Sequence, residues 1–124
     1  MDDDPFVRRL MERTLVRLGH GVATAEDGRD ALRMYREARE AGRPYDAVIL
    51  DLTVPGGIGG VETMAALRGM DPGVRAIVMS GYSDNPVLAH YRDHGFAAIL
   101  PKPFNIERLR AVLAQVLGEA VGTG

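Results

Sequence analysis

The sequence predicts a doubly wound parallel α/β domain, in which helices cover both faces of one sheet. Three short apolar runs without alternation, at residues 47–50, 76–79 and 97–100, are typical of parallel strands that are buried on both faces. Segments with helical periodicity alternate with these runs along the chain. The 124 residues are enough for one packed core, and we expect residues 1–124 to form a single domain.

The first part of the chain predicts two amphipathic helices and one short strand. From residue 5 to residue 18 the apolar side chains recur at helical spacing, and Gly19 supplies a stop. Residues 22–25 are a short strand candidate. Asp27 then has a side chain suited to capping a second helix, which ends at the helix breakers that precede the first apolar run.

Each apolar run is followed by a further helix. A glycine-rich loop at residues 55–60 leads to a helix near residues 61–70, and this loop lacks the lysine of a phosphate-binding P-loop, so we interpret it as flexible. Pro86 suits the first turn of a short helix that stops near Gly95. The last helix carries apolar residues on one face between positions 106 and 116.

Composition excludes several classes of protein. Fifteen basic and seventeen acidic residues give a net charge of -2, which does not favour nucleic acid or anionic lipid. The absence of cysteine excludes disulfides and thiolate metal sites. No apolar run approaches the ~20 residues that span a bilayer, and three aspartates stand where a signal peptide would be basic and then apolar. We therefore expect a cytoplasmic protein without nucleic-acid or membrane partners.

Polar residues end the three apolar runs, and ligands bind at the carboxyl ends of strands in open parallel sheets. These residues are Asp51, Ser80 and Lys102. Each alone has an ordinary alternative, namely a helix cap, a turn residue and a solvated loop lysine. Together they suit a phosphoryl group, because the carboxylate accepts it and the other two contact its oxygens. A divalent cation is then needed, and residues 2–4 supply a cluster of carboxylates that suits Mg²⁺.

Four motifs resemble the receiver domain of two-component response regulators, over essentially the whole chain. They are DDDP at 2–5, VILDLTVPGG at 48–57, VMSGYSD at 78–84 and LPKPF at 100–104. The segments GHGVATAEDG and DLTVPGG also resemble the receivers of hybrid sensor histidine kinases. The resemblance implies a flavodoxin-like fold of three α/β/α layers. It also implies a phosphoacceptor in a phosphorelay, with a sensor histidine kinase or histidine phosphotransfer protein as partner and no turnover as an enzyme.

The resemblance also implies roles for individual residues. Asp51 is the phosphoacceptor, with Ser80 as the switch hydroxyl and Lys102 as the cation that pairs with the phosphoryl group. The Mg²⁺ ligands are Asp2, Asp3, Asp51 and the backbone carbonyl of Thr53, and Asp3 is favoured over Asp2 as the direct ligand. A cis peptide bond is expected between Lys102 and Pro103.

Three positions depart from the family pattern. The switch aromatic falls on Ile99, so we expect signalling to depend on Ser80 and on residues 82–91 instead of a rotating ring. Thr53 and Tyr82 occupy the positions that tune dephosphorylation, and neither can position an attacking water as an acid or amide would. Strong self-hydrolysis is therefore not expected.

Two other functions keep the same residues. A phosphatase or phosphotransferase resembling the haloacid dehalogenase family also combines an aspartate nucleophile, a hydroxyl and a lysine on a parallel sheet. That family needs a second aspartate two residues after the first, where this chain has Thr53. The third possibility is a receiver-like interaction module that is never phosphorylated.

In the fold that the resemblance implies, a first strand lies at the centre of a sheet of order 2-1-3-4-5, but only Met1 precedes Asp2. Four or five buried apolar residues contribute roughly 6–15 kcal/mol, comparable with the stability of a small domain. We expect four regular parallel strands, either in order 2-3-4-5, which would anchor Asp2 and Asp3 poorly, or with an open or partner-filled slot beside residues 48–51. Three explanations are open for such a slot: the natural sequence begins upstream, another segment closes the gap, or another chain closes it. In the last case the protein could self-associate through the gap.

Overall fold

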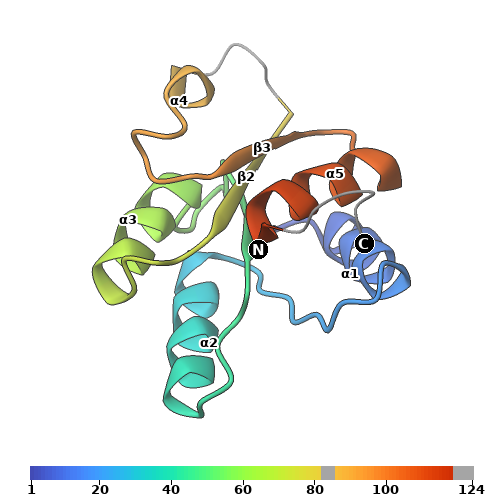
Figure 1. Cartoon of the computed structure of the whole chain (residues 1–124). Coiled ribbons are helices and arrows are strands. Elements are labelled where there is room, and N and C mark those ends of the chain that lie inside the picture. The colour runs from blue at the N-terminus through green and yellow to red at the C-terminus, as the bar shows by residue number, and fades with distance from the viewer. Residues whose placement is uncertain (82–85, 119–124) are drawn as a thin grey trace.

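The structure is a computed structural model and describes residues 1–81 and 86–118. A parallel sheet of three strands forms the centre of this part of the chain (Figure 1). The strands are β1 (Val48–Asp51), β2 (Ala76–Ser80) and β3 (Ala98–Pro101), in the order β1-β2-β3. All three form at the apolar runs that predicted them. Their burial on both faces explains why these runs lack alternation.

Five helices accompany the sheet in the described residues: α1 (Pro5–Arg17), α2 (Gly28–Glu40), α3 (Gly60–Met70), α4 (Pro86–Ala89) and α5 (Ile106–Leu117). Asp27 caps α2, as expected, because its side chain accepts a hydrogen bond from the Asp30 N–H at 3.0 Å. Asp4 caps α1 in the same way. None of these helices combines the length and apolar character needed to cross a lipid bilayer.

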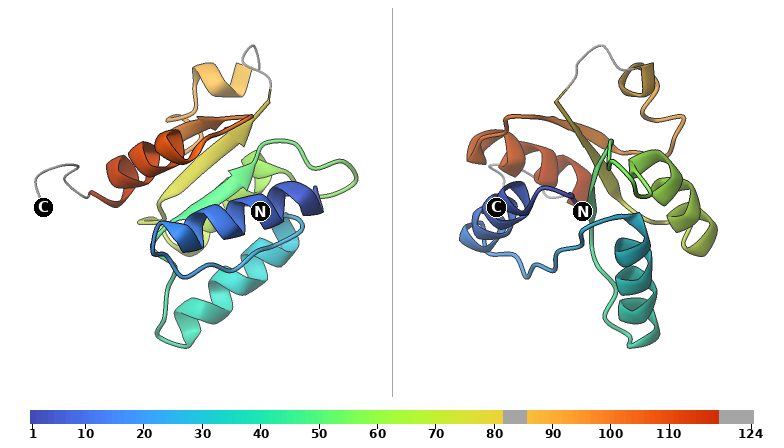
Figure 2. Two further views of the ribbon diagram at one scale, coloured as in Figure 1. Left: turned by 90° about the vertical axis from the view of Figure 1, so that its right-hand side faces the viewer. Right: turned by 180° about the vertical axis from the view of Figure 1, so that it is seen from behind.

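The helices form two layers, one on each face of the sheet (Figure 2). On one face α1 and α5 pack against β2 and β3, where Met11, Leu100 and Leu109 are buried. On the other face α2 and α3 pack against β1 and β2, where Tyr35 and Met64 are buried. The doubly wound, three-layer arrangement predicted from the alternation of strands and helices is therefore confirmed.

The prediction of a fourth strand at residues 22–25 is wrong. This segment is extended but lies outside the sheet, and β1 pairs with β2 alone among the strands. The order 2-3-4-5 is therefore not adopted. A strand needs a neighbour whose backbone groups it can pair with, and residues 22–25 lie across an open groove from β1. The open slot beside residues 48–51 is the expected alternative that the structure shows.

Met1 and Asp2 bridge one end of that slot. The Met1 amino group donates to the Ile49 carbonyl oxygen at 2.7 Å, and the Asp51 N–H donates to the Met1 carbonyl oxygen at 2.9 Å. On the other side, the Asp2 N–H donates to the Ala25 carbonyl oxygen at 3.1 Å. These bonds tie residues 22–25 and β1 together through two residues, which anchors the acidic cluster at the sheet edge.

Two glycines allow α3 to begin directly against the end of β1. A Cβ atom on Gly60 would lie 2.8 Å from the Asp51 backbone oxygen, and one on Gly59 would lie 2.8 Å from the Leu52 backbone oxygen. Backbone atoms at that distance cannot give way without moving the strand end. These two glycines are therefore needed for close packing of α3 against the strand end. The sequence had predicted only that the glycine-rich loop is flexible.

We expect Gly60→Ala to destabilise the protein by about 1–3 kcal/mol, the usual cost of overpacking, because the added methyl group displaces the Asp51 backbone. Gly69→Ala, in the same helix, is the matched control. A Cβ atom there meets nothing within 4 Å, so this substitution should stabilise α3 by up to ~1 kcal/mol. Urea unfolding measures both, and equal effects of the two variants would contradict the packing argument.

Candidate functional site

The candidate site lies where the carboxyl ends of the three strands meet. Asp51 is the last residue of β1 and Ser80 the last of β2, and Lys102 directly follows the last residue of β3. The register places Ser80 beside Pro101, and the Lys102 N–H donates to the Ser80 carbonyl oxygen at 2.9 Å. The structure therefore brings together, along one edge, the three polar residues that the sequence singled out.

Lys102 links the strand ends to the N-terminal acidic cluster. Its Nζ atom lies 3.3 Å from Asp51 Oδ1 and 3.0 Å from Asp2 Oδ2. The two carboxylates are buried, whereas the lysine side chain keeps 26% of its surface exposed. The Lys102–Pro103 peptide bond is cis, as expected. One cation thus contacts two carboxylates that are distant from each other in the sequence.

Asp2 is held by contacts on all sides. Its Oδ1 atom accepts a hydrogen bond from the Asp4 N–H at 2.9 Å, and its backbone carbonyl oxygen accepts one from Arg8 Nη1 at 2.8 Å. These bonds add to those through which Met1 and Asp2 bridge β1 and residues 22–25. The sequence did not predict that Arg8 and the Met1 backbone contribute hydrogen bonds here, because both contacts depend on how α1 lies against the sheet.

The electrostatics of the site follow from burying several charges together. Removal from water raises the pKa of Asp51, and the neighbouring Asp2 carboxylate raises it further, while Lys102 and the Thr53 backbone oppose the change. Burial of the Lys102 ammonium lowers its pKa, but contact with Asp2 and attraction to Asp51 outweigh this effect and raise it overall. Burial also lowers the pKa of the Met1 amino group to about 6. The site is therefore crowded with negative charge that one lysine does not fully balance.

Three carboxylates are arranged so that they could hold a metal ion. Asp2, Asp3 and Asp51 each offer a carboxylate oxygen, and these atoms lie within 4.8 Å of one another. Asp2 Oδ2 is buried, with Lys102 Nζ 3.0 Å away. Oxygen ligands of this kind suit a hard divalent cation such as Mg²⁺, whose charge would relieve the repulsion. The donor set therefore fits the ion that the sequence predicted.

The other predicted residues lie at or near this edge. Thr53 is exposed in the loop that follows Asp51, and its carbonyl oxygen stays a predicted metal ligand. Ile99 is partly buried in β3 and packs with Tyr91 against the core on the α2 and α3 face. Tyr82 lies outside the described residues.

The pKa of Asp51 predicts how stability depends on pH. Because that pKa is raised, the folded protein binds a proton at Asp51 more tightly than the unfolded chain, so the ionised carboxylate costs stability above the folded pKa. Asp51→Asn should therefore raise the melting temperature at pH 7. The gain should disappear as the pH falls below 3.8, the ordinary carboxyl pKa.

Thermal unfolding followed by circular dichroism from pH 3 to pH 8 measures this difference. Asp46→Asn is the matched control, because Asp46 is an exposed aspartate just before the same strand. A gain from Asp51→Asn that does not change with pH would contradict the electrostatic explanation.

Comparison with known proteins agrees with the geometry of the site. A family model described as the response regulator receiver domain matches residues 1–114. Transcriptional regulatory protein PrrA of Mycobacterium tuberculosis (strain ATCC 25618 / H37Rv) is 37% identical over 117 residues, which are 94% of this chain and 48% of PrrA. The chain thus spans about half the length of this relative.

Solved structures have the same fold. Chemotaxis protein CheY4 of Vibrio cholerae superposes with a TM-score of 0.83 and 30% identity, over 94% of this chain and 93% of that one. The receiver domain of sensor histidine kinase PA1611 from Pseudomonas aeruginosa, solved with a magnesium ion in its active site cleft, gives a TM-score of 0.82 and 24% identity, over 95% and 93% of the two chains. The family model, which covers most of the chain, settles the relationship: this chain belongs to the response regulator receiver domains, the signalling domains of two-component systems.

Proposed function

We propose that the chain is a phosphoacceptor whose Asp51 takes a phosphoryl group from phosphohistidine on a sensor histidine kinase or a histidine phosphotransfer protein. The observation that carries this proposal is the position of Lys102, whose Nζ atom lies 3.3 Å from Asp51 Oδ1 at the meeting point of the three strand ends. A carboxylate nucleophile and a cation for the phosphoryl oxygens are thereby held on separate, rigid elements.

The proposed step is an in-line displacement at phosphorus. A carboxylate oxygen of Asp51 forms the new O–P bond while the P–N bond to the donor imidazole breaks, and the bonding electron pair stays on the imidazole nitrogen. The product is an acyl phosphate on Asp51 and a neutral imidazole after proton uptake. The raised pKa of Asp51 still leaves the nucleophile available, because Lys102 favours the ionised form.

Asp2, Asp3, Asp51 and the Thr53 carbonyl are the proposed ligands of Mg²⁺, which supplies positive charge for the phosphoryl oxygens when it is bound. The closeness of the three carboxylates supports this assignment, and the magnesium of the PA1611 receiver supports it by fold similarity. Asp3 is exposed and reaches a bound ion easily, whereas Asp2 is buried against Lys102. These placements favour Asp3 over Asp2 as the direct ligand, and Asp2 in addition positions Lys102.

Ser80 is the proposed switch residue. It is buried at the end of β2, next to the lysine-bearing segment, so a hydroxyl that turns toward a phosphoryl group on Asp51 also disturbs the loop that follows it. Ile99 cannot act as a rotating aromatic ring. The change is therefore proposed to pass through the segment that leads to α4, of which residues 82–85 lie outside the described residues.

In this role the chain is a signalling domain that is modified and does not turn over substrate. The chain spans about half the length of its relative PrrA. We therefore propose this activity and these partners for the receiver domain alone. A cytoplasmic setting and self-association through the gap beside β1 stay predictions. Sedimentation velocity over a hundredfold range of concentration tests self-association.

Incubation with Mg²⁺ and acetyl phosphate, followed by intact mass spectrometry, tests the proposed function. We expect one persistent phosphoryl adduct, which Asp51→Asn abolishes, Asp46→Asn retains, and omission of Mg²⁺ prevents. Continuous release of phosphate without an adduct would instead indicate a phosphatase of the haloacid dehalogenase type. No adduct under any condition, including with a phosphorylated histidine donor, would indicate an unphosphorylated interaction module.

Lys102→Ala should slow formation of the adduct by about 10²-fold, because it removes the cation that meets the phosphoryl oxygens. Lys102→Arg keeps the charge and serves as the matched variant, so it should lose less. The initial rate of adduct formation under saturating Mg²⁺ measures both. An unchanged rate in Lys102→Ala would remove this residue from the mechanism.

A further inference from the structure

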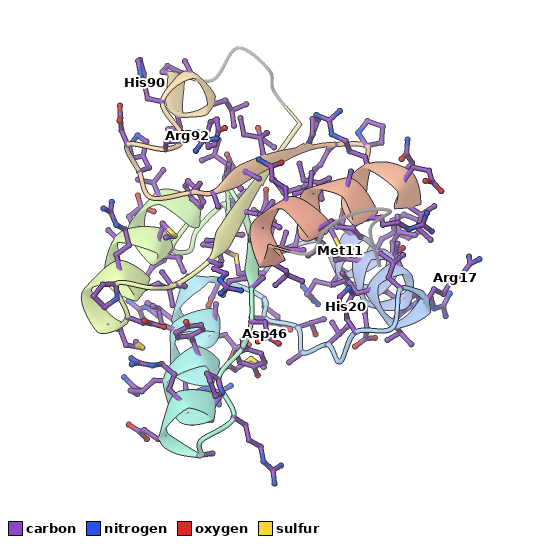
Figure 3. All side chains as sticks on the ribbon, in the orientation of Figure 1. Met11, Arg17, His20, Asp46, His90 and Arg92 are labelled. Carbon is purple, nitrogen blue, oxygen red and sulfur yellow. The ribbon has the colours of Figure 1, made fainter. Side chains whose placement is uncertain are left out.

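One of the four arginines of α1 differs from the others in where its side chain lies. Arg9, Arg13 and Arg17 recur every four residues on the outer side of the helix and are exposed, and Arg17, labelled in Figure 3, points away from the sheet. Arg8 lies three residues before Met11, which is buried in the core against the sheet. The Arg8 side chain therefore leaves the helix on its inner side, and only 19% of its surface is exposed.

The Arg8 guanidinium contacts the acidic segment at the candidate site. Its Nη1 atom donates a hydrogen bond to the Asp2 backbone carbonyl oxygen at 2.8 Å. Its Nη2 atom lies 3.8 Å from Glu26 Oε1, but the Glu26 side chain is 78% exposed, so this ion pair contributes little. The hydrogen bond to Asp2 is therefore the principal polar contact of this side chain.

The Asp3 carboxylate depends on its backbone for its position. It is exposed, and within residues 1–81 and 86–118 no hydrogen bond or ion pair holds it. It nevertheless offers an oxygen within 4.8 Å of oxygens of Asp2 and Asp51. The Asp2 carbonyl and the Asp3 N–H belong to one planar peptide unit. A hydrogen bond that fixes the Asp2 oxygen therefore also fixes the plane from which the Asp3 side chain starts.

Arg8 holds the chain on both sides of Asp3. Its side chain bonds the Asp2 carbonyl oxygen, and its backbone N–H donates to the Asp4 carbonyl oxygen at 3.0 Å. The Asp2 N–H, in turn, donates to the Ala25 carbonyl oxygen at 3.1 Å. Asp3 thus lies between two anchored neighbours, and Arg8 supplies a contact to each of them.

We propose that Arg8 is a positioning residue for the divalent cation, which holds the Asp2–Asp3 peptide so that the Asp3 carboxylate stays beside Asp51, and thereby raises the affinity of the site for Mg²⁺. The inference rests on the magnesium site of the proposed function. Arg8 does not touch the ion, because a guanidinium offers only N–H donors and no acceptor. Its effect passes through Asp2 and Asp3.

The charge and the position of Arg8 have opposite effects on Mg²⁺ binding. A guanidinium repels the cation, so an arginine that acted only through its charge would weaken binding, and its removal would lower the Kd for Mg²⁺. An arginine that positions a ligand has the reverse effect, and its removal raises the Kd. A residue that only stabilises the fold changes the melting temperature of the metal-free protein and leaves the Kd unchanged.

Titration of the chain with magnesium chloride at constant ionic strength, followed by amide NMR shifts without a phosphoryl donor, measures this Kd. Arg8→Met keeps the length of the side chain but loses its charge and its donors, and it should raise the Kd about tenfold, a usual effect of losing a residue that orients a metal ligand. Arg9→Met removes the same charge from the exposed neighbouring position and is the matched control, with an unchanged Kd. An unchanged or lower Kd in Arg8→Met overturns the proposal.

Arg8→Lys separates geometry from charge. It keeps the positive charge but replaces the planar fork of donors by a single ammonium, so the Kd should rise about threefold and lie between those of the unaltered chain and Arg8→Met. This variant decides the question if Arg8→Met does not fold, which thermal unfolding in EDTA reveals. In that case a Kd equal to or below that of the unaltered chain overturns the proposal.

Acetyl phosphate labelling of the same samples distinguishes this inference from the proposed function. Arg8→Met should need about tenfold more Mg²⁺ for the half-maximal rate of adduct formation and should keep the maximal rate. Mg²⁺ binding that depends on Arg8, in a chain that forms no adduct, would support the inference and contradict the phosphoacceptor role. An adduct on Asp51 with a Kd that does not respond to Arg8, or no binding of Mg²⁺ by the unaltered chain, overturns the inference.

Discussion

Much of the site depends on a single constraint, the burial of two carboxylates around one lysine. Asp2 and Asp51 come from positions that are distant in the sequence, and their mutual repulsion in a region shielded from water favours separation. Lys102 offsets this repulsion from the end of β3, reaching across β2, which pairs with both β1 and β3. Imperfect neutralisation leaves the site suited to a further cation, and hence to a phosphoryl group.

Backbone contacts hold the end of β1, which carries Asp51, in place. The Asp51 N–H is bonded by Met1 on one side of the strand, and the Asp51 carbonyl is approached by Gly60 on the other. The N-terminus and α3 therefore both contact the end of β1 that carries Asp51. The glycine-rich loop is consequently part of the positioning apparatus, because residues with side chains would push α3 away from the end of the strand.

The open edge of β1 is the least completed part of the fold. Both helix layers are present, yet α1 and residues 20–25 are joined to the sheet mainly by Met1 and Asp2 and by the packing of α1. Within the described residues, Met1 is what bonds the groove side of the β1 backbone, through the Ile49 carbonyl and the Asp51 N–H. The same bonds of Met1 and Asp2 reach the acidic cluster, so the groove and the site are connected through two residues.

The sequence by itself determined the three buried strands, the alternation with helices, the cap at Asp27 and the set Asp51, Ser80 and Lys102. Each of these depends on local periodicity or on the rule that ligands gather at strand ends, so neighbouring residues are sufficient to predict it. The motifs predicted the family for the same reason.

Only the tertiary structure decided the state of residues 22–25, because a segment with strand propensity becomes a strand only when a neighbour pairs with it. It also decided that Gly60 serves close packing and that Lys102 contacts Asp2 as well as Asp51. Distances between segments that are far apart in the chain set these features, and no local pattern contains those distances.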